Sequence, residues 1–485
     1  MAGIGFKLQK LFREDYASLQ MKAYAYASFI AAGPWLISVL TVAVISHLIR
    51  EYAGLGELES QLFVVTVSYC FIFSQILSGG WQLVVTRFLA DHFYLGKLDI
   101  ITPVFTGISR LVLAVSAAAS VCFYWNSPLP FSYKLVSTVL FLTIGQIWLS
   151  MVFLSAAKNY KAISWAFVGG SVLSIAFVLL LLRYPLPFAV HREASNMLLG
   201  FTFGMLITLC MLAVVLLRTF PSRRMENPYG FLHYADKFPS LLVIGFSYNL
   251  GVWMDNILIW FGPASVTVED TFRFTPVYDN AVFLSYLTVI PSLVLFVVSV
   301  ETRFYDKYRR FYGYIMNGGT LEMILRAKTR MVEVLWHEMI RMTKLQGIIT
   351  LFLILVSRYL LSALGYDSLT VEIFRIYSLG AMGSTLMLTL ILMMLYFEDR
   401  RGALTASLLF FSLNSLFTAG VLPPGLDYYG FNYFLASSIA LAYSAWRLLG
   451  FLHRIEVQTF VSQGLLERSP RGFFTRLGEK AHHWF

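Results

Sequence analysis

The sequence has 485 residues, of which 58% are hydrophobic and 13% are charged, and its net charge is +10. Soluble domains carry about 25% charged residues, so this composition excludes an ordinary soluble protein and indicates a polytopic membrane protein. The basic residues are spread over short loops between apolar segments, which favours orientation in a membrane over nucleic-acid binding.

The chain begins with residues 1–22, in which apolar side chains such as Phe6 and Leu11 alternate with basic ones such as Lys7 and Lys10. This pattern predicts a cytoplasmic amphipathic leader that lies on the membrane surface. A basic leader that only sets the topology explains the segment equally well.

Apolar segments long enough to cross a bilayer follow, six before and six after a polar stretch at 218–237. The predicted spans are 23–49, 61–86, 104–124, 132–157, 162–183, 194–217, 238–261, 279–300, 345–362, 373–397, 402–421 and 430–452. The fold class is therefore an all-α polytopic membrane protein with 12 transmembrane helices in two six-helix lobes. The lobes are expected at 23–217 and 238–453.

Charge predicts the orientation of these spans. The 218–237 linker contains Arg218, Arg223, Arg224 and Lys237, and short cytoplasmic loops collect Lys and Arg. With the N-terminus in the cytoplasm, most of the 37 Lys and Arg lie at inner span ends. We therefore expect a cytoplasmic linker, a cytoplasmic 454–485 tail and both termini inside.

Helix breakers interrupt several spans. They are Gly33 and Pro34 in span 1, Gly79 and Gly80 in span 2, and Pro291 in span 8. Proline removes a backbone hydrogen bond, and such breaks often line the pathway in transporters. We interpret these residues as candidate hinges or kinks, although Gly and Pro are also ordinary in membrane helices.

Arg87 ends span 2 within Thr86-Arg87-Phe88, and Thr302-Arg303-Phe304 ends span 8 in the same way. This repeated Thr-Arg-Phe motif supports two related lobes. Arg87 also has Asp91 four residues further on, which predicts an ion pair along the helix. Arg87 is a candidate for the substrate path, and an anchor at the helix end is the alternative.

The largest segment between spans, 301–344, is predicted to be a cytoplasmic helical insertion. Thr320 can cap a helix over 320–343 that has one apolar face. On that face we single out Leu325, Val332 and Leu335 as a hypothetical docking stripe. The stripe can also pack on its own bundle or on the lipid surface.

Asp255 in span 7 is the one carboxylate more than a turn inside any predicted span. A charge at that depth needs water or a partner, so we expect Asp255 about six residues below the outer helix end, facing the path between the lobes. Tyr248 and Asn249 would continue a polar, aromatic track. The alternative is a structural ion pair with Arg358 or Arg375.

Motifs for chemistry are lacking in the sequence. There is no P-loop, no Gly-x-Ser-x-Gly elbow and no His, Cys and Asp cluster with ligand spacing. We therefore expect no catalytic residues, no metal site and no cofactor.

Several segments in order resemble one family. They are Met1 to Phe6, the run from Ala23 to Trp35, Val84 to Asp91, Pro276 to Asp279, Val300 to Tyr305, and Phe397 to Arg401. Together they are similar to the PelG family, which belongs to the multidrug/oligosaccharidyl-lipid/polysaccharide (MOP) exporter superfamily. The resemblance implies a fold like that of MATE transporters and flippases in the bacterial inner membrane.

The resemblance also implies a function. Such a protein would export a galactosamine-rich, partly deacetylated polysaccharide to the periplasm for a biofilm matrix. Its implied partners are a cytoplasmic glycosyltransferase and membrane subunits that include a cyclic-di-GMP receptor.

Two other function classes compete. An ion-coupled antiporter of small molecules or lipid-linked oligosaccharides has the same architecture, but spans 1 to 6 contain no Asp or Glu in their interiors. A polytopic membrane enzyme needs a large outer loop with catalytic residues, and no predicted loop is long enough.

Overall fold

The computed structural model describes most of the chain, namely residues 33–52, 57–188, 190–221, 227–298, 303–423, 425, 428–456 and 472–484. The predicted 1–22 leader lies outside these residues. Contacts divide the chain into two compact units, and each is described by itself.

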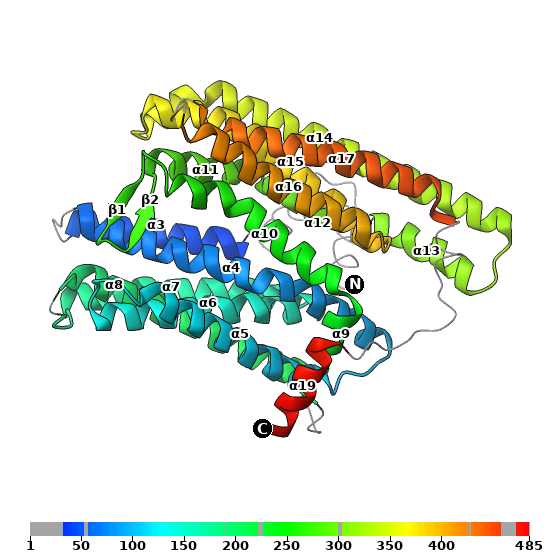
Figure 1. The fold of residues 1–485 in the computed structure, drawn as a ribbon, viewed down its shortest axis with the longest axis horizontal. Helices are drawn as coiled ribbons and strands as arrows, with labels where there is room; N and C mark the ends of the chain where they lie inside the picture. The colour runs from blue at the N-terminus through cyan, green and yellow to red at the C-terminus, as the bar shows by residue number, and fades with distance from the viewer. Residues whose placement is uncertain are drawn as a thin grey trace, which may run out of the picture. The chain divides into compact units, whose positions relative to one another are not determined.

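The first unit contains Gly33–Phe274 and Leu465–Phe485. Its elements are α3 (Gly33–Tyr52), α4 (Glu57–Tyr94), α5 (Ile101–Tyr124), α6 (Phe131–Ala156), α7 (Tyr160–Arg183), α8 (Arg192–Thr219), α9 (Leu232–Lys237), α10 (Pro239–Ile259), β1 (Val266–Val268), β2 (Phe272–Phe274) and α19 (Phe473–Trp484). Helices α4, α6, α7 and α8 run side by side in this unit (Figure 1). The two strands form an antiparallel hairpin in which Thr267 pairs with Arg273.

The second unit contains the described residues of Thr275–Gly464. Its helices are α11 (Pro276–Thr288), α12 (Ile290–Val298), α13 (Tyr305–Met316), α14 (Leu321–Ala363), α15 (Ser368–Tyr396), α16 (Arg400–Val421) and α17 (Phe431–His453). Helix α15 is the centre of this unit and packs against α11, α14, α16 and α17.

The span count agrees with the sequence. Within the described residues, 11 helical segments are long and apolar enough to cross a membrane, and Gly33–Leu48 is a shorter apolar helix. Each of these twelve segments overlaps one of the twelve predicted spans, and residues 23–32 of the first predicted span lie outside the described residues. Exposed apolar side chains along the second half of α14, such as Leu355 and Tyr359, are those expected of a surface covered by lipid.

The boundary between the contact-defined units differs from the predicted one. The prediction divides the lobes at 218–237, whereas the contacts place the division between Phe274 and Thr275. The reason is that α10, the seventh span, packs closely against α4.

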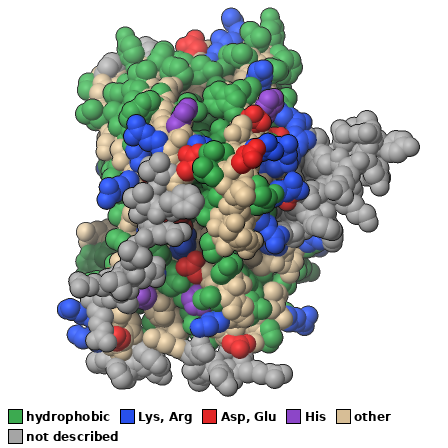
Figure 2. All heavy atoms as spheres, turned by 90° about the vertical axis from the view of Figure 1, so that its right-hand side faces the viewer, with side chains coloured by type: hydrophobic (Ala, Val, Ile, Leu, Met, Phe, Trp, Pro, Cys, Tyr) green, Lys and Arg blue, Asp and Glu red, His purple; other side chains and the backbone are tan. Residues whose placement is uncertain are grey.

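The predicted insertion also differs from the structure. Its second helix and span 9 were expected as separate segments, but α14 runs without interruption from Leu321 to Ala363. Thr320 begins this helix as predicted, since its hydroxyl accepts a hydrogen bond from the Met323 amide at 3.3 Å. Figure 2 shows Lys and Arg side chains spread over the face that lies at the right of Figure 1.

Candidate functional site along α4 and α10

Helices α4 and α10 approach each other at a crossing of glycines. A Cβ atom on Gly245 would lie 2.3 Å from the carbonyl oxygen of Gly79, and one on Gly80 would lie 2.9 Å from the carbonyl oxygen of Leu242. Only glycine permits such close approach of two backbones. Helix α4 continues as an α-helix through Gly79 and Gly80, so the structure shows these predicted hinge residues in a packing contact, without an interruption of the helix.

Polar side chains follow the crossing along the same seam. Gln75 on α4 donates to the Asn249 side-chain oxygen at 3.2 Å, and its own oxygen accepts from the Trp253 indole at 3.4 Å. Asn249 also donates to the Gly245 carbonyl at 2.7 Å. The predicted track residue Asn249 therefore lies in a network with Gln75, which sequence reasoning missed. A glutamine in the middle of an apolar span was the available signal.

Asp255 lies further along α10, and its exposed fraction is 0%. Helix α10 ends at Ile259, so Asp255 lies four residues from its end, closer than the six predicted. Asn256 beside it is also buried, whereas Tyr248 is half-buried. Of the proposed ion-pair partners, Arg375 donates to the Ser357 hydroxyl at 2.9 Å within the second unit.

Arg87 lies at the other end of the seam. Its guanidinium forms the predicted ion pair with Asp91 at 3.3 Å and lies 5.3 Å from the centre of the Phe238 ring, just before α10. Because α4 and α10 run antiparallel, the structure brings Asn249 to Gln75 and leaves Arg87 near the start of α10. Arg87 and Asp255 are thus not part of one cluster.

The β1 to β2 hairpin is bound to the end of the unit near Asp255. The Tyr69 hydroxyl donates to the Arg273 carbonyl at 2.6 Å, and the Tyr69 ring stacks on Trp260 with centroids 4.6 Å apart. The hydroxyls of Ser127 and Thr271 form a hydrogen bond of 2.7 Å. Aromatic stacking and hydrogen bonds therefore hold the hairpin against α4 and the loop after α5.

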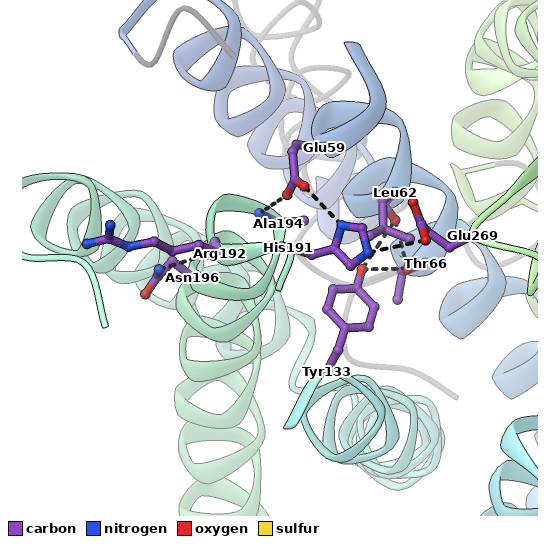
Figure 3. Close-up of polar contacts among 9 residues, drawn as sticks. All are labelled: Glu59, Leu62, Thr66, Tyr133, His191, Arg192, Ala194, Asn196 and Glu269. Carbon is purple, nitrogen blue, oxygen red and sulfur yellow. Dashed lines mark hydrogen bonds and ion pairs between the residues drawn. The ribbon is translucent and has the colours of Figure 1, made fainter. Parts of the chain in front are cut away.

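An imidazole joins two carboxylates at this end of the unit (Figure 3). His191 Nδ1 lies 3.0 Å from Glu59 at the start of α4, and Nε2 lies 3.3 Å from Glu269 in the hairpin turn. Glu59 also accepts from the Ala194 amide at 2.9 Å, at the first turn of α8. His191 and Glu269 have positive φ angles of 48° and 49°, which cost roughly 1 kcal/mol or more and persist where the surroundings fix them.

The cluster of His191, Glu59 and Glu269 pairs acids from the start of α4 and from the hairpin turn at this end of the unit. Glu59 and Glu269 both contact His191. Among the described residues, no three His, Cys, Asp or Glu side chains form a group that could hold a metal ion.

The opposite end of the first unit carries α19, from the tail predicted at 454–485. The Asp236 carboxylate of α9 accepts hydrogen bonds from the Phe474 and Thr475 amides at 3.2 and 2.6 Å, at the start of α19. Burial opposes ionisation of Asp236, but the hydrogen bonds from Thr475 and Phe474 hold its pKa below the usual value. Phe474 also contacts Trp81 of α4 edge to face, with centroids 5.9 Å apart.

The predicted break at Pro291 is visible in the second unit. Helix α11 ends at Thr288 and α12 begins at Ile290. The Ser292 amide bonds to Val289, and the Gln346 side chain of α14 donates to the Thr288 carbonyl at 2.9 Å. Gln346 also accepts from the Ser292 hydroxyl at 2.7 Å. The buried Gln346 side chain thus provides a hydrogen bond to a backbone carbonyl at the break. Membrane helices interrupted by proline need such a partner, because lipid offers none.

The predicted docking stripe is divided between two environments. Leu335 is buried with an exposed fraction of 4%, Val332 is half-buried and Leu325 is 41% exposed. The buried face of this part of α14 is formed by Ile324, Met331, Leu335 and Met342. Leu335 therefore packs within its own unit, and Leu325 remains accessible.

The other predicted breakers, Gly33 and Pro34, lie at the first described residues of α3. The Ser38 hydroxyl donates to the Pro34 carbonyl at 2.9 Å. This bond satisfies one carbonyl in the first turn of the described helix.

The fold is shared with solved transporters. An outward-facing multidrug resistance MATE transporter of the MOP superfamily is 13% identical, with a TM-score of 0.61 over 94% of this chain and 100% of that one. A MOP superfamily transporter from Pyrococcus furiosus, whose binding pocket has reversed polarity, is 12% identical, with a TM-score of 0.58 over 94% and 99%. The Vibrio cholerae MATE transporter VcmN in its bent form is 12% identical, with a TM-score of 0.57 over 90% and 98%.

These neighbours establish the fold, a MATE-like arrangement of twelve helices in two lobes. No curated protein matches the sequence. A family model does match, over residues 1–460, and it describes the PelG exopolysaccharide exporters (EPS-E). With nearly the whole length matched and the transporter fold in place, the chain belongs to the PelG family of exopolysaccharide exporters.

Proposed function

We propose that this exporter moves a galactosamine-rich, partly deacetylated polysaccharide of the Pel type from the cytoplasm to the periplasm. It would lie in the bacterial inner membrane with both termini in the cytoplasm. Membership in the exporter family and the MATE-like fold support polysaccharide export. The identity of the polymer rests on the sequence resemblance.

The observation that carries the proposal is the seam between α4 and α10. Amide and indole groups of Gln75, Asn249 and Trp253 form one network there, and Asp255 places a carboxylate beyond them. Side-chain amides can hydrogen-bond to sugar hydroxyls, and aromatic rings can pack against the apolar faces of sugar rings. A carboxylate suits the free amines of a deacetylated polymer, so we assign Asp255, Asn249 and Tyr248 to the path.

We further propose that the cognate glycosyltransferase and the membrane subunits of the synthase, including a cyclic-di-GMP receptor, work with this chain. Polymer growth would then drive export. An ion-coupled antiporter is the weaker alternative, because acids that carry ions within a membrane lie inside the spans, and α3 and α5 to α8 have none beyond their end turns. We propose no catalytic step for this chain.

The test of the path is Asp255→Asn in the chain reconstituted with its synthase. We expect normal assembly and reduced polymer export, with Asp270→Asn as a control because Asp270 is an exposed acid in the nearby hairpin turn. Equal export by Asp255→Asn and the native chain would remove Asp255 from the path. Loss of stable protein, rescued by neutralising Arg358 or Arg375, would assign the acid to the fold.

The test of the driving force uses the same reconstituted system. Export with the ion gradients collapsed, at an unchanged rate of polymer synthesis, is the expected result. Export that stops when the gradient is collapsed would favour the antiporter.

A further inference from the structure

A groove between α13 and α14 gathers four basic side chains. It has a volume of about 250 Å³ and is lined by Lys307, Arg310, Tyr314, Met323, Arg326, Ala327 and Arg330. Two of the cations come from each helix. The helical hairpin formed by α13 and α14 thus brings together charges from two consecutive helices.

Three of these four charges have no partner among the residues that the structure describes. Arg326 forms an ion pair with Glu322 on the same helix. Lys307, Arg310 and Arg330 make no ion pair or hydrogen bond with any residue in the described part of the chain. By contrast, Arg303 and Lys328 in the same hairpin pair with Glu338 and Glu456. Like charges repel one another across the groove, and a bound anion would relieve this repulsion.

The position of the groove decides where its ligand comes from. Helix α14 is continuous from Leu321 to Ala363, and its apolar part begins after Lys344. Arg330 lies about 21 Å from Lys344 along the helix, at ~1.5 Å per residue. A lipid phosphate would lie near Lys344, at the membrane surface, so an anion in this groove comes from solution.

The side chains that line the groove define the chemistry of the ligand. Guanidinium groups bind phosphate oxygens in pairs, which makes arginine the preferred residue for phosphate recognition. The half-buried Tyr314 offers a flat ring beside them, and such rings stack on bases and sugars. A volume of about 250 Å³ holds a diphosphate with part of its attached group, but it is too small for a folded partner.

We propose that this groove binds the diphosphate of a soluble nucleotide. Arg310 of α13 and Arg330 of α14 both line the groove and would clamp the phosphates, and Lys307 would add a third positive charge. Tyr314 would contact the nucleoside. Occupancy would join α13 to α14 through a shared anion, which stabilises the hairpin outside the membrane. The proposal does not depend on which polymer the chain exports.

The experiment measures binding to the full chain in nanodiscs of neutral lipid, by calorimetry at low salt. The probes are uridine diphosphate, inorganic pyrophosphate and uridine. We expect both phosphate compounds to bind and uridine to fail. The affinity for uridine diphosphate should fall by about tenfold in Arg310→Ala and again in Arg330→Ala, because each removes a charge-assisted contact. Binding should also weaken as salt rises.

The matched control is Arg309→Ala, which removes an exposed arginine that does not line the groove. A loss in Arg309→Ala equal to that in Arg310→Ala would overturn the proposal, because it would indicate general charge attraction. Absence of phosphate binding by a native chain that elutes as a single species would also overturn it. A final arm repeats the titration in nanodiscs of anionic lipid. Competition by that lipid at the groove would show that the site takes lipid headgroups and contradict the assignment to a soluble ligand.

Discussion

The glycine crossing of α4 and α10 gives the sharpest test of how the first unit is held together. In Gly245→Ala the new Cβ would lie 2.3 Å from the carbonyl oxygen of Gly79, where ordinary contacts are 3.4 Å or longer. The obstructing atom belongs to the backbone, so relief requires the two helices to separate by about 1 Å. Overpacking of this kind costs about 1–3 kcal/mol.

Separation of the helices also acts on the polar network. The hydrogen bond from Gln75 to Asn249 is 3.2 Å long, and an extra ~1 Å would break it. A lost hydrogen bond costs about 0.5–1.5 kcal/mol. The two costs sum to about 1.5–4.5 kcal/mol. Alanine is favoured over glycine inside a helix by about 1 kcal/mol, so we expect Gly245→Ala to destabilise the chain by about 0.5–3.5 kcal/mol.

The assay compares variants in one detergent by thermal denaturation at one heating rate. The control is Gly450→Ala in α17, where an added Cβ meets no atom within 4 Å. Alanine is favoured over glycine inside helices by about 1 kcal/mol, so the control should be neutral or stabilised while Gly245→Ala melts earlier. If the two variants have the same melting temperature, the close crossing is not what holds α10 to α4.

Three further predictions address topology, partner docking and the tail helix. A single cysteine in place of Ser222 should be labelled only from the cytoplasm and one in place of Thr267 only from outside, and labelling of Ser222 from the periplasm would disprove the orientation. Replacing Leu325 and Val332 by serine should reduce co-purification of the glycosyltransferase with no loss of folded protein, since Leu325 is exposed and Val332 is only half-buried; unchanged assembly would reject the docking stripe. Asp236→Ala should weaken docking of α19 by about 1 kcal/mol at neutral pH, seen as faster amide exchange in α19. Because the pKa of Asp236 is lowered in the fold, its contribution to docking is present above the unfolded pKa of about 4 and is lost as pH falls through the folded pKa. Amide protection of α19 that changes neither with pH nor with the substitution would contradict this role.

Features encoded by local patterns were predictable. The span count follows from apolar length, the Thr320 cap from one residue type at a helix start, and the pair of Arg87 and Asp91 from helical spacing. Each depends on residues a few positions apart, where the geometry of the helix fixes the distance. The amphipathic face of 320–343 was also correct as a pattern. The pattern could not show that Leu335 packs inside its own unit while Leu325 stays exposed.

The network around Asn249 could not be predicted, because its partners are far apart in the chain. Gln75 and Asn249 are separated by 174 residues, and their contact depends on the close approach of two helices at small residues. The same holds for His191, which joins acids from the start of α4 and from a hairpin turn. Single acids in loops indicate charge on one side of a membrane. They do not indicate which of those charges the fold has already paired.

Pro291 shows how a local signal and a distant residue combine. The proline marks where a spanning helix is interrupted, and this signal is local in the sequence. The Thr288 carbonyl at the break accepts a hydrogen bond from the side chain of Gln346, which lies 58 residues further along the chain. A buried glutamine inside a span is costly unless it has partners, and an unsatisfied carbonyl is costly for the same reason. The two costs cancel only when the two helices are packed together, so the break and the glutamine favour one arrangement of α11, α12 and α14. Helix breakers in a transporter sequence therefore indicate where to look, and the polar residue that faces the break identifies which helix is bound to it.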